Sequence, residues 1–130
     1  MRVSIKQVRP TKLELRVLGA LWQTGGGTVR EIHEILDREE SIGYTTVLKM
    51  LQIMTDKGLA RRDESVRPFV YRTKHSQAKT QEHLLSDLIH RAFGGSVKAL
   101  VVRALAVSKS SKEDLREIER MLDEFDRKKK

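Results

Sequence analysis

Residues 44–73 read YTTVLKMLQIMTDKGLARRDESVRPFVYRT, and the spacing of the apolar residues changes halfway along this stretch. From Tyr44 to Lys57 the apolar residues recur at helical spacing, and Gly58 is a natural stop for such a helix. Four of them lie within one narrow arc and are expected to face a core: Val47, Met50, Leu51 and Met54. Beyond the glycine, Leu59 to Asp63 and Phe69 to Thr73 predict two short strands joined by a charged turn. The stretch therefore predicts a helix followed by a β-hairpin.

Two capping boxes mark helix starts upstream of this stretch, at Thr11-Lys12-Leu13-Glu14 and at Thr28-Val29-Arg30-Glu31. They predict one helix that ends near Thr24, before Gly25–Gly27, and a shorter one that ends near Arg38. The residues expected to face the core are Leu15, Leu18, Leu21 and Trp22 in the first helix and Val29, Ile32, Ile35 and Leu36 in the second. Helix, short helix, helix and hairpin is the order of a winged helix-turn-helix, in which Gly25–Gly27 is placed to supply the small third strand.

The second half of the chain predicts three helices and no strand. Their bounds follow from serine caps and a glycine pair: Ser76 to Phe93, a break at Gly94-Gly95, Ser96 to about Val107, and a last helix opened by Ser110-Ser111-Lys112-Glu113. Apolar residues span roughly 180° of the first of these helices and roughly 120° of the last. Three helices of this length bury too little apolar surface to be stable alone, so we expect them to pack against a second copy of the chain.

The fold class we predict is mainly α with a small β-hairpin wing. Residues 1–75 form a winged-helix domain, and residues 76–130 form a helical dimerisation domain with a basic C-terminal tail. The residues expected at the dimer interface are Leu84, Leu85, Leu88, Ile89, Phe93, Leu100, Val101, Leu105, Leu115, Ile118, Leu122 and Phe125.

The chain is basic, since 26 Lys and Arg against 18 Asp and Glu give a net charge of +8. Residues 1–75 carry 14 of these cations against 9 acidic residues, whereas four cations of the second half form the tail Arg127–Lys130. A basic balance favours a polyanionic partner. The chain has no cysteine, which excludes disulfides and thiolate metal sites, and no segment approaches the roughly 20 apolar residues of a membrane span. We expect a cytoplasmic protein that binds no cofactor and does not enter a membrane.

A winged helix lays its third helix in the major groove of DNA, and contacts from its wing to phosphates fix the register. Thr45 and Thr46 place short hydroxyls at the start of the predicted third helix, and Lys49 follows one turn later. Threonine at a helix start is also a frequent cap, Tyr44 is also suited to packing there, and neighbouring arginines also form solvated strand faces. Together with the order of the elements, these residues favour a DNA-binding domain. We predict DNA contacts from Tyr44, Thr45, Thr46, Lys49, Gln52, Arg61, Arg62, Arg67 and Arg72.

Several short segments, in the right order, resemble the penicillinase-repressor family (the BlaI, MecI and CopY types), which regulates β-lactamase, methicillin resistance and copper transport. They are Leu18–Trp22, Thr28–Ile32, Tyr44–Leu48, Asp56–Leu59, Val70–Arg72 and Phe93–Ser96, and the resemblance covers about residues 11–125. It implies a transcriptional repressor that binds a palindromic operator as a homodimer, with the C-terminal helices swapped around each other. It also suggests DNA contacts from Thr45, Thr46 and Lys49, and wing contacts near Arg67.

Three departures from the family pattern limit what the resemblance implies. Members commonly carry basic residues where this chain has Gln52 and Ile53, so the operator sequence does not carry over; Ile53 either touches a thymine methyl or is partly covered by the wing. Copper-responsive members carry a C-terminal cysteine cluster, which this chain lacks. Antibiotic-responsive members are inactivated by cleavage of an Asn-Phe bond, but this chain has no asparagine and has Arg103-Ala104-Leu105 at the corresponding place. A membrane-linked sensor protease stays a candidate partner; either it cuts a different bond or derepression works another way.

The alternative to a repressor is a winged-helix protein-interaction module without specific DNA binding, whose apolar C-terminal faces bind an unlike partner. No Ser/His/Asp arrangement, phosphate-binding loop or pair of carboxylates stands out, so we predict that the protein is not an enzyme. His83 and His90 are seven residues apart, which is too far for one mononuclear metal site on a helix, so we predict no metal site.

Overall fold

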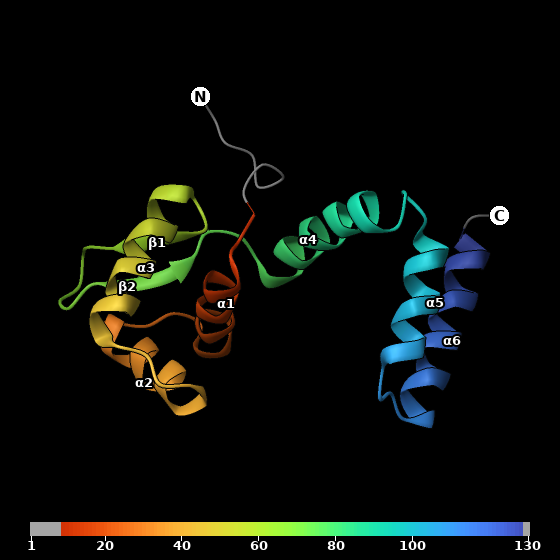
Figure 1. Cartoon of the computed structure of the whole chain (residues 1–130), viewed down its shortest axis with the longest axis horizontal. Helices are drawn as coiled ribbons and strands as arrows, with labels where there is room; N and C mark the ends of the chain where they lie inside the picture. The colour runs from red at the N-terminus through yellow and green to blue at the C-terminus, as the bar shows by residue number, and fades with distance from the viewer. Residues whose placement is uncertain (1–8, 129–130) are drawn as a thin grey trace. The chain divides into compact units, whose positions relative to one another are not determined.

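The computed structural model describes residues 9–128 of the chain (Figure 1). Its elements in chain order are α1 (Lys12–Thr24), α2 (Val29–Glu39), α3 (Tyr44–Lys57), β1 (Ala60–Asp63), β2 (Val70–Thr73), α4 (Gln77–Ala92), α5 (Val97–Val107) and α6 (Lys112–Lys128). The predicted fold class, a winged helix followed by a helical region, is confirmed. The chain divides into two compact units, one up to Asp87 and one from Leu88 onward, so the division lies inside α4. The functional division after residue 75 stays a prediction.

Local hydrogen bonds set the ends of the first three helices where the sequence predicts them. At the start of α1 the Thr11 hydroxyl accepts a bond from the Glu14 N–H at 3.2 Å, and the Glu14 carboxylate accepts one from the Thr11 N–H at 2.8 Å. Thr28 and Glu31 repeat this box at the start of α2, at 3.2 and 2.9 Å. Helix α3 ends at Gly58, whose φ of +83° lies in the left-handed region that glycine adopts without strain.

The hairpin is antiparallel, and its register pairs Arg61 with Arg72 and Arg62 with Tyr71. Both strands begin one residue later than the sequence predicts. Leu59 joins the two elements: its N–H donates to the Met54 carbonyl at 2.9 Å and completes the end of α3, while its carbonyl accepts a bond from the Lys74 N–H at 3.1 Å. The expected third strand is a single bridging residue, Gly27, which exchanges two backbone hydrogen bonds with Tyr71.

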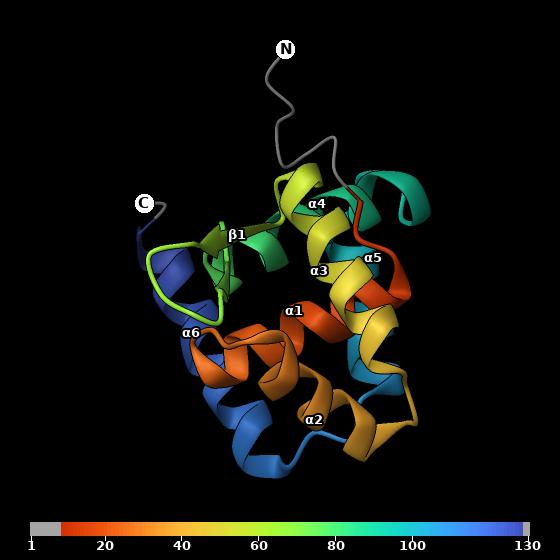
Figure 2. The same cartoon turned by 90° about the vertical axis from the view of Figure 1, so that its left-hand side faces the viewer.

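One face of each of the first three helices turns inward to form the core of the winged helix: α1 and α3 pack against the hairpin, and α2 packs against α1 and α3 (Figure 2). The prediction that Leu15 faces the core is wrong, since 38% of this residue is exposed, and Trp22, Ile35 and Met50 are only partly buried. The inward face of α1 runs through Glu14, Val17, Leu18 and Leu21, and Leu15 is turned about 100° round the helix from Glu14, toward solvent. The buried apolar residues are Val17, Leu18, Ala20, Leu21, Val29, Ile32, Leu36, Val47, Leu51, Met54, Leu59, Ala60 and Tyr71.

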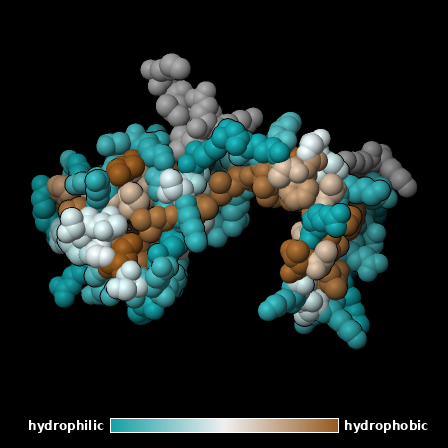
Figure 3. Space-filling view, viewed as in Figure 1, coloured by the Kyte–Doolittle hydropathy of each residue, from teal (hydrophilic) through white to brown (hydrophobic). Residues whose placement is uncertain are grey.

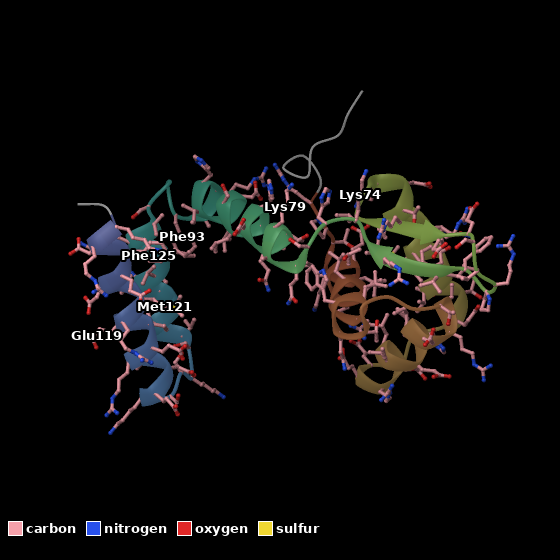
Figure 4. All side chains as sticks on the ribbon, turned by 180° about the vertical axis from the view of Figure 1, so that it is seen from behind. Lys74, Lys79, Phe93, Glu119, Met121 and Phe125 are labelled. Atoms are coloured by element: carbon pink, nitrogen blue, oxygen red, sulfur yellow. The ribbon has the colours of Figure 1, made fainter. Side chains whose placement is uncertain are left out.

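The C-terminal unit keeps its apolar residues at the surface. No residue of α5 or α6 as described is buried. Figure 2 shows these two helices diverging from the turn that connects them, and Figure 3 shows hydrophobic residues on the outside of this unit. Figure 4 marks two of the exposed apolar residues, Met121 and Phe125, on α6. No helix within residues 9–128 is long and apolar enough to cross a membrane.

Candidate nucleic-acid interface

Helix α3 turns a polar face to solvent. Its buried residues Val47, Leu51 and Met54 fix one side against the core, and Thr45, Thr46, Lys49 and Gln52 are all exposed. The residue before the helix is Gly43, and no side chain caps the helix start. The two threonine hydroxyls are therefore not used as caps, which removes one of the alternatives that the sequence left open.

Tyr44 is fixed at the start of α3 while about half of it stays exposed. Its ring meets the ring of His33 edge-on, with centroids 5.8 Å apart and planes at 77°. The His33 ring is held in turn, because its Nε2 lies 2.8 Å from the Ile42 carbonyl oxygen. Tyr44 is 48% exposed, so it both packs and presents polar surface beside the exposed face of α3. The sequence allowed two interpretations of Ile53, a contact with a thymine methyl or partial cover by the wing. In the structure Ile53 is half-buried.

The four predicted wing arginines are exposed but do not form one cluster. Arg61 and Arg72 face each other across the strands, and cross-strand partners lie on the same face of a hairpin. Arg72 is anchored there, since its Nη1 donates to the Gly25 carbonyl at 2.8 Å. Asp63 lies beside both, and its pKa is lowered by hydrogen bonds from the Ser65 hydroxyl and N–H and, less strongly, by the two arginines.

The other two arginines, Arg62 and Arg67, lie over the ring of Phe69, with guanidinium carbons 4.9 and 4.4 Å from its centroid. Arg62 Nε also donates to the Glu64 carboxylate at 2.9 Å, and Arg67 Nη1 donates to the Glu64 carbonyl at 2.6 Å. Hydrogen bonds with Tyr71 and Glu64 raise the pKa of Arg62. Arg62 and Arg67 are therefore held by contacts within the wing, as Arg72 is held by its bond to the Gly25 carbonyl.

A partly buried ion pair beneath the end of α3 was not predicted from the sequence. Glu14 is only 1% exposed, and Lys57 Nζ donates to its two carboxylate oxygens at 2.7 and 3.0 Å. Burial alone raises the pKa of Glu14, but the hydrogen bonds from Lys57 and Thr11 and the charge of Lys57 outweigh it and leave the pKa lowered. The pair ties the start of α1 to the end of the helix that carries the exposed polar face.

The signal for this pair was weak but present. Glu14 lies four residues before Leu18 and three after Thr11, so a helical wheel places it near the core side of α1. The capping box alone already accounts for a glutamate at position 14, so the sequence offered no separate reason to expect an ion pair with Lys57. Phe69, the platform of Arg62 and Arg67, was treated only as a strand residue.

Comparison with known proteins identifies relatives along most of the chain. Residues 10–124 match the penicillinase repressor family. Transcriptional regulator BlaI of Mycobacterium tuberculosis, in strains CDC 1551 / Oshkosh and ATCC 25618 / H37Rv, is 32% identical over 99 residues, which are 75% of this chain and 72% of the relative. Penicillinase repressor of Bacillus licheniformis is 23% identical over 117 residues, 90% of this chain and 91% of the relative. These relatives are named as regulators or repressors rather than enzymes, and the resemblance drawn from the sequence motifs is confirmed.

Proposed function

Since this chain belongs to the penicillinase repressor family, whose relatives are named as transcriptional regulators and repressors, we propose that it binds a DNA operator as a homodimer. Helix α3 is the element that enters the major groove. The observation that carries this proposal is its exposed polar face, on which neither threonine hydroxyl is used as a cap. Side chains of this kind make hydrogen bonds to base edges and phosphates.

The wing supplies the contacts that hold the protein on the DNA backbone. Arg61 and Arg72 share one face of the hairpin, and Arg72 is positioned by its bond to the Gly25 carbonyl. Arg62 and Arg67 keep their charge while they stack on Phe69, so they add to the positive field of the wing. Contacts of this class neutralise phosphates and carry little sequence information.

The homodimer is proposed because the C-terminal helices have no interior of their own. Exposed apolar side chains continue from the end of α4 through α6, and a soluble chain rarely leaves so many without a partner. A second copy offers the same surface, so association of two copies buries the exposed apolar side chains of both. The large exposed apolar residues described in this unit are Leu88, Val97, Val101, Val102, Leu105, Val107, Leu115, Ile118, Met121, Leu122 and Phe125.

Release from the operator needs a step that differs from cleavage at Asn-Phe, because the chain contains no asparagine. A membrane-linked sensor protease belongs to this proposal only if it cuts another bond. Arg103, Ala104 and Leu105, which correspond to the cleaved stretch, are exposed within α5.

The test is binding of fluorescent duplexes from the promoter region of the protein's own gene, followed by anisotropy at several salt concentrations. Affinity should fall steeply with added salt, because phosphate contacts release counterions. The variant Thr46→Ala/Lys49→Ala should lose at least about tenfold of specific affinity, since each base contact discriminates by about 1–3 kcal/mol. Non-specific affinity should change much less.

The matched control is Lys12→Ala, which removes one exposed cation from α1 and leaves α3 and the wing unchanged. It should lose no specificity. Equal losses of specific and non-specific affinity in the α3 variant would show that these residues only contact phosphate. Absence of any sequence-selective binding would favour the protein-interaction module instead.

A further inference from the structure

A cleft of about 460 Å³ lies between the start of α2, the exposed face of α3 and the wing. All the residues that line it belong to the first compact unit. Its volume falls in the range of about 300–1,000 Å³ that is usual for small-molecule sites. Three of its lining residues, Tyr44, Gln52 and Arg62, are also predicted DNA contacts, whereas Arg30, Leu48 and Phe69 have no role in the proposed DNA binding.

The lining combines an apolar wall with positive charge. Leu48 and Phe69 are partly buried and contribute apolar and aromatic surface, while Arg30 of α2 and Arg62 of the wing contribute positive charge. No aspartate or glutamate is among the lining residues described. Tyr44 and Gln52 add a phenol and an amide from α3. An apolar wall that carries only positive charge is complementary to a flat apolar molecule with one negative group.

We propose that this cleft is an effector site that takes a small aromatic carboxylate. The aromatic ring packs against Leu48 and Phe69, and the carboxylate accepts hydrogen bonds from the arginines. Arg guanidinium groups bind carboxylates in a planar, bidentate geometry, which lysines do not provide.

Arg30 is the arginine that is available to such an anion at small cost. Arg30 Nε lies 3.5 Å from the Glu34 carboxylate, and both side chains of this pair are largely exposed. Arg62 is held more firmly, because its side chain is only 34% exposed, bonds Glu64 and lies over the ring of Phe69. Exposed ion pairs contribute little to stability, so exchange of Glu34 for the carboxylate of a bound molecule costs little.

The consequence for regulation rests on the proposed function. Tyr44 and Gln52 line the cleft and belong to the predicted DNA contacts, so a molecule in the cleft occupies space beside the base-reading face. Binding of the aromatic carboxylate and binding of DNA then exclude each other. At a concentration ten times its Kd, the carboxylate weakens apparent DNA affinity about elevenfold, by mass action alone. This is a route to derepression that requires no cleavage.

The probe we choose is 1-naphthoate, with the neutral 1-naphthamide as its matched analogue, and binding to the full chain is measured by isothermal titration calorimetry. We expect saturable binding of naphthoate and at least about tenfold weaker binding of the amide, since a hydrogen bond to a charged group contributes more than one to a neutral group. The variant Arg30→Gln should weaken naphthoate binding roughly tenfold and leave naphthamide binding unchanged. Its control is Arg38→Gln, a neighbouring exposed arginine of α2 outside the cleft.

A second variant, Leu48→Phe, fills the cleft and should abolish naphthoate binding while the helical circular dichroism stays that of the wild type. If this variant fails to fold, the comparison of Arg30→Gln with Arg38→Gln decides. The proposal is overturned by the absence of saturable naphthoate binding up to millimolar concentration, by equal binding of the amide, or by equal losses in the two arginine variants.

Competition with DNA separates this proposal from the proposed function. Naphthoate should displace the promoter duplex from the wild type but not from Leu48→Phe. If the duplex never binds selectively, the proposed function fails, and the calorimetry still tests the cleft. If naphthoate does not bind and Arg30→Gln instead weakens all duplexes and lowers the salt slope, the cleft takes a backbone phosphate, which overturns the effector site and supports DNA binding.

Discussion

Replacing Glu14 with glutamine removes one buried charge from α1 and leaves its capping box intact. A glutamine at this position still accepts a hydrogen bond from the Thr11 N–H, as the carboxylate does at 2.8 Å. The ion pair with Lys57, at 2.7 Å, is lost. The variant therefore isolates the contribution of the pair that joins α1 to the end of α3.

The size of the effect follows from the exposure of the two partners. Breaking a fully buried pair costs about 3–5 kcal/mol, because a charge is left in the interior. Here 35% of the Lys57 side chain is exposed, so the remaining ammonium regains water, and we expect about 1.5–2.5 kcal/mol. The reverse change, Lys57→Met, leaves the carboxylate of Glu14 buried and should cost more, about 3 kcal/mol. Glu31→Gln is the control, since Glu31 has the same capping role but is exposed, and it should cost less than about 0.5 kcal/mol.

The pH dependence has a definite sign. The pKa of Glu14 is lowered in the folded protein, so the unfolded chain binds its proton more readily. Its contribution is fully present above the ordinary value of 4.5 and is lost as pH falls through the lowered pKa. The stability gap between wild type and Glu14→Gln should therefore narrow as the solution is acidified. The pKa of Glu31 is also lowered, by hydrogen bonds with Thr28, so its smaller gap narrows in the same direction.

The assay is urea unfolding at a fixed protein concentration, followed by far-ultraviolet circular dichroism at several pH values. A fixed concentration is needed because the stability of a dimer depends on it. The reasoning is refuted if Glu14→Gln is no more destabilising than Glu31→Gln, or if Lys57→Met costs less than Glu14→Gln.

Three further changes test the packing. Gly26→Ala should lower the free energy of unfolding by more than about 1 kcal/mol in urea titration. Gly26 has a φ of +121°, and an added Cβ would lie 2.9 Å from Arg72 Cγ and 3.1 Å from the Tyr71 carbonyl oxygen. An unchanged unfolding midpoint would contradict this prediction. Leu51→Ala should cost about 2–5 kcal/mol in the same titration, since Leu51 is fully buried in α3, and a loss below 1 kcal/mol would mean that the core relaxes around it. Leu88→Asp should shift the chain from dimer to monomer in sedimentation and weaken operator binding without loss of helical signal, and an unchanged mass would count against this interface.

Short-range chemistry made most of the fold predictable. The ends of α1, α2 and α3 depend on residues within four positions of one another, such as Thr11 with Glu14 or Met54 with Gly58, and these patterns are visible in the sequence. The hairpin was predictable because the apolar period changes after Gly58. Each strand begins one residue later than predicted: the Leu59 N–H donates to the Met54 carbonyl at the end of α3, and Phe69 lies in the turn before β2.

The sequence predicted which residues of α3 and the wing are exposed, but not which partners these side chains contact. The exposed face of α3 follows from the helical period once Val47, Leu51 and Met54 are placed inward. The partners of the wing arginines depend on strand register and on Phe69, which the alternation of residues alone does not specify. Glu14 and Lys57 are 43 residues apart, so only the packing of α1 against α3 brings them together.

The central claim, that two copies of this chain bind DNA through α3, is tested most directly by hydroxyl-radical footprinting of the wild type and Leu88→Asp on a selected operator fragment. A dimer bound through α3 should give two symmetrical protected tracts whose centres are separated by about one helical turn, 10–10.5 base pairs, or a multiple of it. Leu88→Asp should lose both tracts at concentrations where the wild type protects fully. A single protected tract, or equal protection by the variant, would contradict the claim.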